Sequence, residues 1–369
     1  MTDQLTAATQ LIEEGIASGL HLGAQLYVSH RGRVVTDLAL GESSPGTPMT
    51  PDSIMVWLSA TKPMVAVMFA KLWTEGLVAL DAPVADVVPE FAQHGKETIT
   101  FRHLLTHTAG LRPVKLRRDA MSFEEQVEAV CATTIKPNWR PGYRAAYDPQ
   151  FTWLILGEAI RRLRQRPLSD VLRKELFEPL GMSDCWLGMP DDIFDAVESR
   201  IGAMPRTDGG TAVGSTLSTR AACTDVWPAG GAYGPMRQLA NFYEMLLRRG
   251  EHEGTAFLSS PLVEAITARH RVRLLDENFK EVIDWGLGFV LDSKRADQHD
   301  LPYGYGPHAS PRTFGHSGYQ SSCAYADPEH DLVVAFVFNG MPGEGNHRRR
   351  ARELNEAIYV ELGLGSGNS

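Results

Sequence analysis

The chain contains few cysteines, and none of them stand in a paired motif. Its 369 residues include only four, Cys131, Cys185, Cys223 and Cys323, and no two of them have the C-x-x-C spacing. The sequence therefore gives no support for a cysteine-based metal or redox site. We expect reduced thiols that pack as small hydrophobic side chains, as in a cytoplasmic protein.

Long hydrophobic runs are also missing. No segment approaches the roughly 20 apolar residues that a membrane helix needs, so we expect no membrane partner. The first 15 residues are polar and acidic, whereas a secretory signal is basic and then apolar. This pattern predicts a cytoplasmic protein, although a secreted chain already free of its signal would look the same.

Positive charge is scarce relative to negative charge. The chain has 36 Lys and Arg against 45 Asp and Glu, which gives a net charge of −9 at pH 7. Nucleic-acid binding needs clustered cations, so nucleic acid is not an expected partner. The arginine run 348–350 is better explained as a solvated face near the start of the last helix. The glycine pairs 209–210 and 230–231 stand alone, and they form no phosphate loop or dinucleotide fingerprint. We expect no cofactor.

Two histidines have a spacing that suits a metal, but the rest of the motif is absent. His103 and His107 are four residues apart, as two zinc ligands on one helix face would be. Leu104 occupies the position of the glutamate in H-E-x-x-H, and no third ligand is evident. We therefore expect structural histidines and no metal.

What the chain does contain is a mixture of strand and helix patterns. Alternating or apolar runs predict strands at 25–29, 34–40, 286–291, 322–326 and 332–338. Helical periodicity predicts helices at about 5–16, 59–76, 122–132, 152–163 and 238–248, and from about 350 onward. Strands at both ends around a helical insert predict an α/β (α+β) fold with a largely antiparallel sheet and a helical second lobe.

The segment Ser59-Ala60-Thr61-Lys62 can supply a nucleophile and its base. A serine and a lysine three residues apart share one helix face, so the amine can accept the hydroxyl proton. Lysine has an ordinary pKa of about 10.4, and burial together with a second positive group would lower it. Amides at the helix start would favour negative charge at Ser59. Pro63 lacks an amide hydrogen and fits only near the helix start.

Tyr147 is a second candidate for proton transfer. It follows a Pro-Gly turn and lies on a loop just before the helix that begins near Thr152. A phenol there would relay protons with Lys62, either donating to a leaving group or accepting from Ser59. An ordinary half-buried loop tyrosine would have the same local sequence.

The segment 314–319 (FGHSGY) precedes an apolar strand and is expected to form an edge strand along a cleft. Its glycines allow the backbone to approach a substrate closely. The amide of Tyr319 would pair with the amide of Ser59 as an oxyanion hole. The segment also approaches the G-x-S-x-G nucleophile elbow. However, Tyr319 replaces the second glycine, and no strand–elbow–helix context follows.

Together, in this order and spacing, the three motifs resemble those of the serine β-lactamase and penicillin-binding protein superfamily. The likeness is closest to its class C-like branch and the family VIII carboxylesterases. It extends over most of the chain through further phrases typical of the family, at 77–84 (LVALDAPV), 103–111 (HLLTHTAGL), 177–182 (FEPLGM) and 285–289 (WGLGF).

The resemblance implies one catalytic unit, 1–369, of two lobes with a cleft between them. We expect an α/β lobe from about 1–80 and 286–369, and a mainly helical lobe from about 81–285.

The resemblance also implies roles for the motif residues. Ser59 would be the acylated nucleophile, Lys62 its base and Tyr147 the partner acid and base. The cleft-edge strand would carry His316, Ser317 and Gly318. An apolar acyl pocket would draw on aromatic residues, although core packing explains each of them about as well; the candidates are Trp57, Tyr143, Trp227, Tyr233 and Tyr319.

Two departures from the family pattern bear on the substrate. The third position of the Y-x-N motif is Pro149, and proline cannot supply the amide donor that would bind a β-lactam or peptide carbonyl. The K-T-G motif appears with His316 in place of lysine, which removes a permanent positive charge. Both changes favour a small-molecule ester as substrate, and an ester's leaving alcohol needs less proton assistance than an amine.

The sequence leaves several activities open. Hydrolysis and acyl transfer use the same acyl-serine, so an acyltransferase of natural-product biosynthesis is the alternative to an esterase. β-Lactamase or D-aminopeptidase activity ranks lower. A sensor that is acylated without turnover is the non-enzymatic alternative. Neither the acyl group nor the oligomeric state follows from the sequence.

Overall fold

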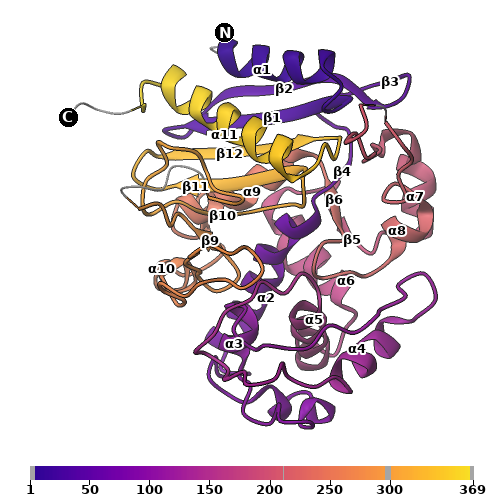
Figure 1. The fold of residues 1–369 in the computed structure, drawn as a ribbon, viewed down its shortest axis with the longest axis vertical. Coiled ribbons are helices and arrows are strands. Elements are labelled where there is room, and N and C mark those ends of the chain that lie inside the picture. Colours follow the sequence, from indigo (N-terminus) through magenta and orange to yellow (C-terminus); the bar gives the residue numbers. More distant parts are fainter. Residues whose placement is uncertain (1–4, 211, 296–300, 366–369) are drawn as a thin grey trace.

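Strands from the two ends of the chain pair in one antiparallel sheet (Figure 1). The computed structural model describes residues 5–210, 212–295 and 301–365. The seven strands of this sheet have the order β3-β2-β1-β12-β11-β10-β9. Their bounds are β1 Gly23–His30, β2 Arg33–Ser44, β3 Thr47–Pro48, β9 Val290–Leu291, β10 Phe314–Ser317, β11 Ser322–Asp327 and β12 Leu332–Phe338. The predicted mixed fold with an antiparallel sheet is confirmed.

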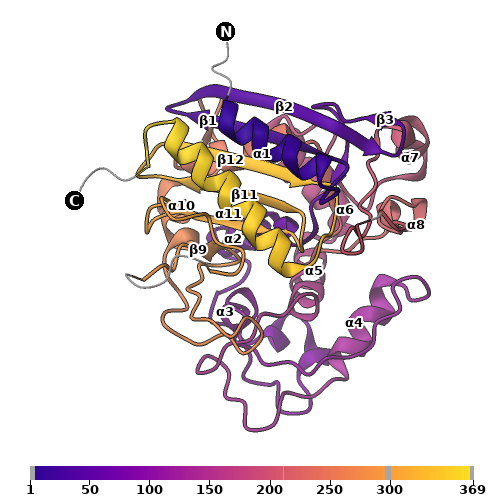
Figure 2. The same cartoon turned by 45° about the horizontal axis from the view of Figure 1, so that its top comes forward.

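Helices cover both faces of this sheet, which explains the composition of its central strands. Figure 2 shows α1 (Thr6–Ala17) and α11 (Glu344–Glu361) side by side on one face. The other face packs against α9 (Met236–Leu247). Because neither face of β12 meets water, all seven of its residues are buried, and its sequence is the unbroken apolar run LVVAFVF.

A tight turn joins the first two strands and sets their register. Arg31 and Gly32 link β1 to β2, and both have positive φ, at 52° and 70°. A two-residue hairpin of type I′ requires positive φ at both central positions, since that twist matches the strands. The sequence placed this turn correctly.

A mainly helical region lies below the sheet in Figure 1. Within it, α2 packs against α5. Its α-helices, with those of the neighbouring segments, are α2 Lys62–Thr74, α3 Phe101–Leu105, α4 Phe123–Cys131, α5 Phe151–Arg164, α6 Leu168–Leu172, α7 Asp191–Val197, α8 Arg220–Thr224 and α10 Ser260–Thr267.

Short elements complete the chain. A small sheet contains β4 Met55–Val56, β5 Trp186–Leu187 and β6 Ala232–Gly234, and a hairpin contains β7 Glu251–His252 and β8 Thr255–Ala256. The remaining helical turns are η1 Leu58–Thr61, η2 Val84–Asp86, η3 Pro89–Phe91, η4 Arg173–Phe177, η5 Glu178–Leu180 and η6 Glu198–Arg200.

Three elements differ from the sequence prediction. The last helix begins at Glu344, six positions before the predicted start near residue 350. The prediction missed its first turn because the first inward-facing residues, His347 and Arg350, are polar and hide the helical periodicity. The strand predicted at 286–291 pairs only at β9, since Gly288 has a φ of 80° and the Leu287 amide bonds to α10 instead. Helix α9, predicted within the helical lobe, packs against the sheet.

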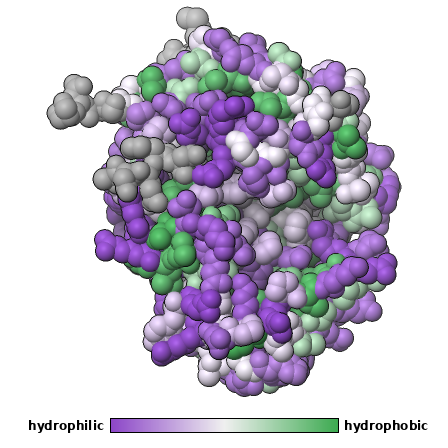
Figure 3. Space-filling view, in the orientation of Figure 1, coloured by the Kyte–Doolittle hydropathy of each residue, from purple (hydrophilic) through white to green (hydrophobic). Residues whose placement is uncertain are grey.

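The surface seen in Figure 3 is largely hydrophilic, with apolar residues in scattered patches. In the part of the chain that the structure describes, no helix combines the length and the apolar character needed to cross a bilayer. All four cysteines are buried and unbridged.

The central strand offers a test of the packing. Phe336 is 0% exposed on β12 and contacts Phe338, so Phe336→Ala should lower the free energy of unfolding by about 3–5 kcal/mol. Val34→Ala on β2, where the side chain is 46% exposed, should change it by less than about 0.5 kcal/mol. Urea unfolding monitored by circular dichroism measures both. Equal losses in the two variants would contradict the assigned sheet core.

Candidate active site

Ser59 lies at the junction of the two lobes, on the short helical turn η1 between β4 and α2. It is the second residue of η1, so its amide is among the first ones, which have no carbonyl partner within the helix. Pro63 is the second residue of α2, where a missing amide hydrogen costs nothing. The expected difficulty with this proline therefore does not arise.

The backbone just before Ser59 adopts a rare conformation. Leu58 has a φ of 50°, which is unfavourable for a side chain with a Cβ. Hydrogen bonds on both sides of Trp57 hold this turn in place. Its amide donates to the Ala232 carbonyl at 2.9 Å, and its carbonyl accepts from Ser322 Oγ at 2.6 Å. These two bonds hold the unfavourable backbone conformation of Leu58 in place, directly before Ser59.

The three predicted catalytic side chains meet at one hydroxyl. Lys62 Nζ lies 2.9 Å from Ser59 Oγ, and Tyr147 donates its hydroxyl hydrogen to the same oxygen at 2.8 Å. Lys62 Nζ also donates to the carbonyls of Ala229 at 2.7 Å and Pro149 at 3.0 Å. A neutral amine has two hydrogens and one lone pair. With both hydrogens on carbonyls, its lone pair is directed at Ser59.

The electrostatics of the site make the neutral amine accessible near pH 7. Lys62 is 0% exposed, and burial lowers its pKa to about 7, although the nearby Asp148 carboxylate acts in the opposite direction. Burial raises the pKa of Tyr147, so the phenol keeps its proton. His316 is also neutral, because burial, followed by the charge of Lys62, lowers its pKa to about 3.

Asp148 is a functional candidate that the motif analysis did not single out. Its carboxylate accepts the amides of Gln150 at 2.9 Å and Phe151 at 2.8 Å at the start of α5, and its own amide donates to His107 Nδ1 at 2.9 Å. An aspartate shortly before a helix is a recognisable capping signal. It ties the loop that carries Tyr147 to the helical lobe and places a negative charge near Lys62.

The end of β10 approaches the nucleophile turn very closely. A Cβ on Gly318 would lie 2.4 Å from both Ser322 Oγ and the Trp57 carbonyl oxygen, so only glycine fits. The next residue, Tyr319, lines the same cavity as Ser59. At His316 and Ser317, β10 pairs with β11 but not with β9, so this part of the strand is an open edge, as predicted.

A cavity of about 670 Å³ opens beside Ser59. Its walls are mainly apolar, and α11 contributes the charged residues Glu344 and Arg348. The residues around it are Leu58, Ser59, Tyr147, Pro149, Leu217, Trp227, Asn278, Phe279, Ile283, Trp285, Val290, Pro302, Tyr303, His316, Ser317, Tyr319, Met341, Glu344 and Arg348.

Three residues predicted for the acyl pocket lie elsewhere. Trp57 is fully buried, donates its indole hydrogen to the Gly234 carbonyl and packs edge-on against Phe177. Tyr233 is buried on β6 and donates its hydroxyl to a backbone carbonyl. Tyr143 is 62% exposed beneath the Arg140 guanidinium. Each aromatic ring is used for packing, and only Trp227 and Tyr319 of the predicted set line the cavity.

The wall that the sequence missed comes from the segment between α10 and β9. Asn278, Phe279 and Ile283 belong to it, together with Trp285, which appeared only as part of a family phrase. Nothing local identifies these residues as lining a cavity. They reach Ser59 because the chain returns from the helical lobe toward the sheet at this point.

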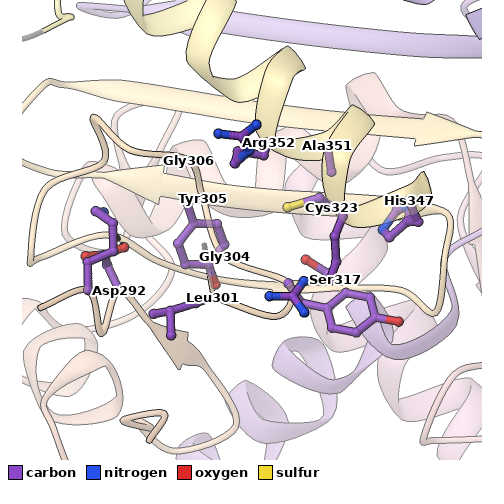
Figure 4. A pocket seen from close by; sticks show the side chains of 13 residues that line it. Asp292, Leu301, Gly304, Tyr305, Gly306, Ser317, Cys323, His347, Ala351 and Arg352 are labelled. Carbon is purple, nitrogen blue, oxygen red and sulfur yellow. Dashed lines mark hydrogen bonds and ion pairs between the residues drawn. The ribbon is translucent and has the colours of Figure 1, made fainter. Parts of the chain in front are cut away.

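A second cavity lies behind β10, beneath α11 (Figure 4). Ser317, Cys323 and Tyr305 are among the residues around it. It measures about 20 Å³, which is close to the space of one water molecule. It is too small for a substrate. The 670 Å³ cavity is the candidate binding site because Ser59 and Tyr147 line it.

The two histidines considered as metal ligands each accept a backbone hydrogen bond. His103 Nδ1 accepts from the Thr100 amide at 3.1 Å, and His107 Nδ1 accepts from the Asp148 amide at 2.9 Å. The ring of His107 also packs against Tyr147 and Trp285. Both rings therefore contribute to the local structure.

The arrangement of sheet, helical lobe and Ser59 turn defines a class of proteins with known members. Residues 8–358 match the family model described as Beta-lactamase. The chain belongs to the beta-lactamase family, within the superfamily of serine β-lactamases and penicillin-binding proteins, and it has the β-lactamase/transpeptidase-like fold.

The similarity to individual relatives extends over most of the chain. Esterase/beta-lactamase LipL from Mycobacterium tuberculosis (strain ATCC 25618 / H37Rv) is 28% identical over 346 residues, which cover 86% of this chain and 77% of that protein. The crystal structure of a family VIII carboxylesterase matches with a TM-score of 0.80 and 26% identity, over 96% of this chain and 97% of the other. A penicillin-binding protein homologue from Caulobacter crescentus matches with a TM-score of 0.79 and 29% identity, over 98% of each chain.

The contact at Gly318 predicts a local effect on Ser59. Gly318→Ala should push β10 away from the nucleophile turn and slow the labelling of Ser59 by a fluorophosphonate by about tenfold or more, since small displacements at a reacting centre are costly. Gly345→Ala, whose Cβ would meet nothing within 4 Å, is the matched control. Intact-protein mass against time measures the rate. Labelling of Gly318→Ala at the wild-type rate would show that the close approach has no role.

Proposed function

We propose that this protein is a serine hydrolase that cleaves carboxylic esters through an acyl-Ser59 intermediate. The main support for this proposal is that Ser59 Oγ lies within hydrogen-bond distance of both Lys62 Nζ and Tyr147 Oη, beside an apolar cavity. The esterases and the family VIII carboxylesterase among its relatives support a hydrolase.

In acylation, neutral Lys62 takes the hydroxyl proton of Ser59 while Oγ attacks the ester carbonyl carbon. The negative charge on the carbonyl oxygen is stabilised by the amides of Ser59 and Tyr319. When the carbon–oxygen bond to the alcohol breaks, Tyr147 donates its proton to the leaving oxygen and regains one from Lys62. The step releases an alcohol and leaves the acyl group on Ser59.

Deacylation reverses these roles with water as the nucleophile. The Lys62–Tyr147 pair takes a proton from water, which attacks the acyl carbon, and the proton returns to Ser59 Oγ as the acid leaves.

The lining of the cavity favours esters over β-lactams and peptides. Pro149 has no side-chain amide, and its carbonyl is already occupied by Lys62. His316 is neutral and supplies no charge for a substrate carboxylate. The walls offer apolar contact instead, through side chains such as Trp227, Phe279 and Ile283. These features suit an uncharged ester with a bulky apolar group.

Acyl transfer is the second candidate function. A cavity of about 670 Å³ is large enough to hold an acceptor beside an acyl group, and its apolar walls would disfavour water relative to an organic nucleophile.

We propose a cytoplasmic location for either activity, because the four buried thiols are unbridged.

Turnover of p-nitrophenyl butyrate tests the central claim. The wild-type protein should hydrolyse this ester steadily, and Ser59→Ala should lower kcat by about a thousandfold or more because it removes the nucleophile. Ser18→Ala, at the exposed end of α1, should keep wild-type activity. Activity that survives in Ser59→Ala would refute the mechanism. Stoichiometric acylation without turnover would point to a transferase awaiting its acceptor or to a sensor.

The pH dependence tests Lys62 as the base. Only the neutral amine can accept a proton, so kcat/KM should rise with pH along an acid limb centred near the Lys62 pKa of about 7. The Asp148 carboxylate stabilises the protonated amine, so Asp148→Asn should move this limb to lower pH. Asp184→Asn, which affects a carboxylate paired with Arg200, should leave it in place. A limb that stays fixed or moves upward in Asp148→Asn would contradict the assignment.

A further inference from the structure

A fully buried ion pair stands behind the cavity wall that the sequence missed. Arg271 NH1 lies 3.1 Å from Asp276 Oδ2, and both side chains are 0% exposed. Arg271 also donates three hydrogen bonds to backbone carbonyls, two to Ile283 and one to Thr106. The ion pair and these bonds therefore hold Arg271, Asp276 and Ile283 together. They also connect this segment to Thr106.

The second oxygen of Asp276 organises the residues around Tyr147. Asp276 Oδ1 accepts three backbone amides, from Tyr147 at 3.1 Å, Asn278 at 3.0 Å and Phe279 at 3.2 Å. A carboxylate oxygen can accept several donors at once, and a negative charge strengthens each bond. One atom thus joins the loop that carries the phenol to the loop that forms the cavity wall.

The two neighbours ordered by Asp276 also hold Tyr147 directly. Asn278 donates from its side-chain nitrogen to the Tyr147 carbonyl at 2.6 Å. The ring of Phe279 packs on the ring of Tyr147, with centroids 5.0 Å apart. Tyr147 is consequently held at three points: Asp276 bonds to its amide, Asn278 bonds to its carbonyl, and Phe279 packs on its ring. Its hydroxyl is left to meet Ser59.

Stability alone does not explain a charged pair at this place. Burying two ions costs desolvation energy, and replacing such a pair by packed hydrophobic residues is often neutral or stabilising. Apolar side chains could not accept the Tyr147, Asn278 and Phe279 amides, however. The specific contribution of the carboxylate is the placement of these groups.

We propose that Asp276 is a positioning residue for proton donation by Tyr147, acting through the 276–279 segment and charge-balanced by Arg271. The inference rests on the proposed role of Tyr147 as the acid for the leaving alcohol. A displaced phenol harms the reaction most where the leaving oxygen needs a proton. Alkyl esters need one, whereas p-nitrophenolate leaves without one.

The test compares two esters with the same acyl group, ethyl butyrate and p-nitrophenyl butyrate. Both form the same butyryl-Ser59, so the ratio of their kcat/KM values isolates the acylation step. Asp276→Asn should lower kcat/KM for the ethyl ester by about tenfold or more relative to the p-nitrophenyl ester. A loss of folded protein would lower both values equally and leave the ratio unchanged.

Three further variants calibrate the result. Tyr147→Phe removes the phenol itself and should show the largest leaving-group effect. Asn278→Ala removes the bond to the Tyr147 carbonyl together with one polar side chain of the cavity wall. It introduces no unpaired charge and should change the ratio in the same direction by a smaller factor. Asp327→Asn changes another fully buried carboxylate, bonded to Ser310 and Tyr359 away from the site, and should leave the ratio at the wild-type value.

Each outcome decides the matter. A leaving-group effect in Tyr147→Phe and in Asp276→Asn supports the inference, and Asn278→Ala decides alone if Asp276→Asn does not fold. An effect in Tyr147→Phe with none in a folded Asp276→Asn overturns the role of Asp276 and leaves the proposed function intact, whatever Asn278→Ala shows. No effect in Tyr147→Phe overturns the role of the phenol, and the positioning role with it.

Discussion

The site depends on a single nitrogen that is kept out of water. Lys62 Nζ is completely buried and contacts Ser59 Oγ and the carbonyls of Pro149 and Ala229. Carbonyls satisfy its hydrogens without the full counter-charge of a carboxylate, so burial can lower its pKa to about 7. The nucleophile turn, the Tyr147 loop and the segment before β6 all converge on this amine. Lys62 therefore connects all three segments, in addition to the bonds that hold each of them separately.

Much of the fold could be predicted from the sequence, because its signals are local. The apolar run of β12, the Arg31-Gly32 turn and the periodicity of α1, α4 and α5 all identify elements that the structure contains. The errors come from long-range effects. Helix α11 begins in a polar stretch, since its first buried residues are His347 and Arg350. Helix α9 packs against the sheet, which no property of its own sequence indicates.

The same division holds for the site. The Ser59–Lys62 pair is local, and Tyr147 was found by its motif. In contrast, Asp276 accepts a hydrogen bond from the Tyr147 amide, 129 positions earlier in the chain, and no local sequence pattern predicts a contact over that distance. Aromatic character also did not reveal which way a ring faces. Trp57 and Tyr233 are committed to packing and to backbone carbonyls, whereas Phe279, which no motif identified, lines the cavity.

The pairing of β1 with β12 has a consequence for synthesis on the ribosome. The Gly23 amide bonds to the Asn339 side chain, 316 positions further along the chain, and the Ser322 hydroxyl braces the nucleophile turn across 265 positions. The sheet is completed only after β12, which ends at Phe338, has left the exit tunnel, and such distant contacts form slowly. Until then, the edge of β1 that pairs with β12 is open. The contacts that hold the turn before Ser59 are consequently completed late in translation.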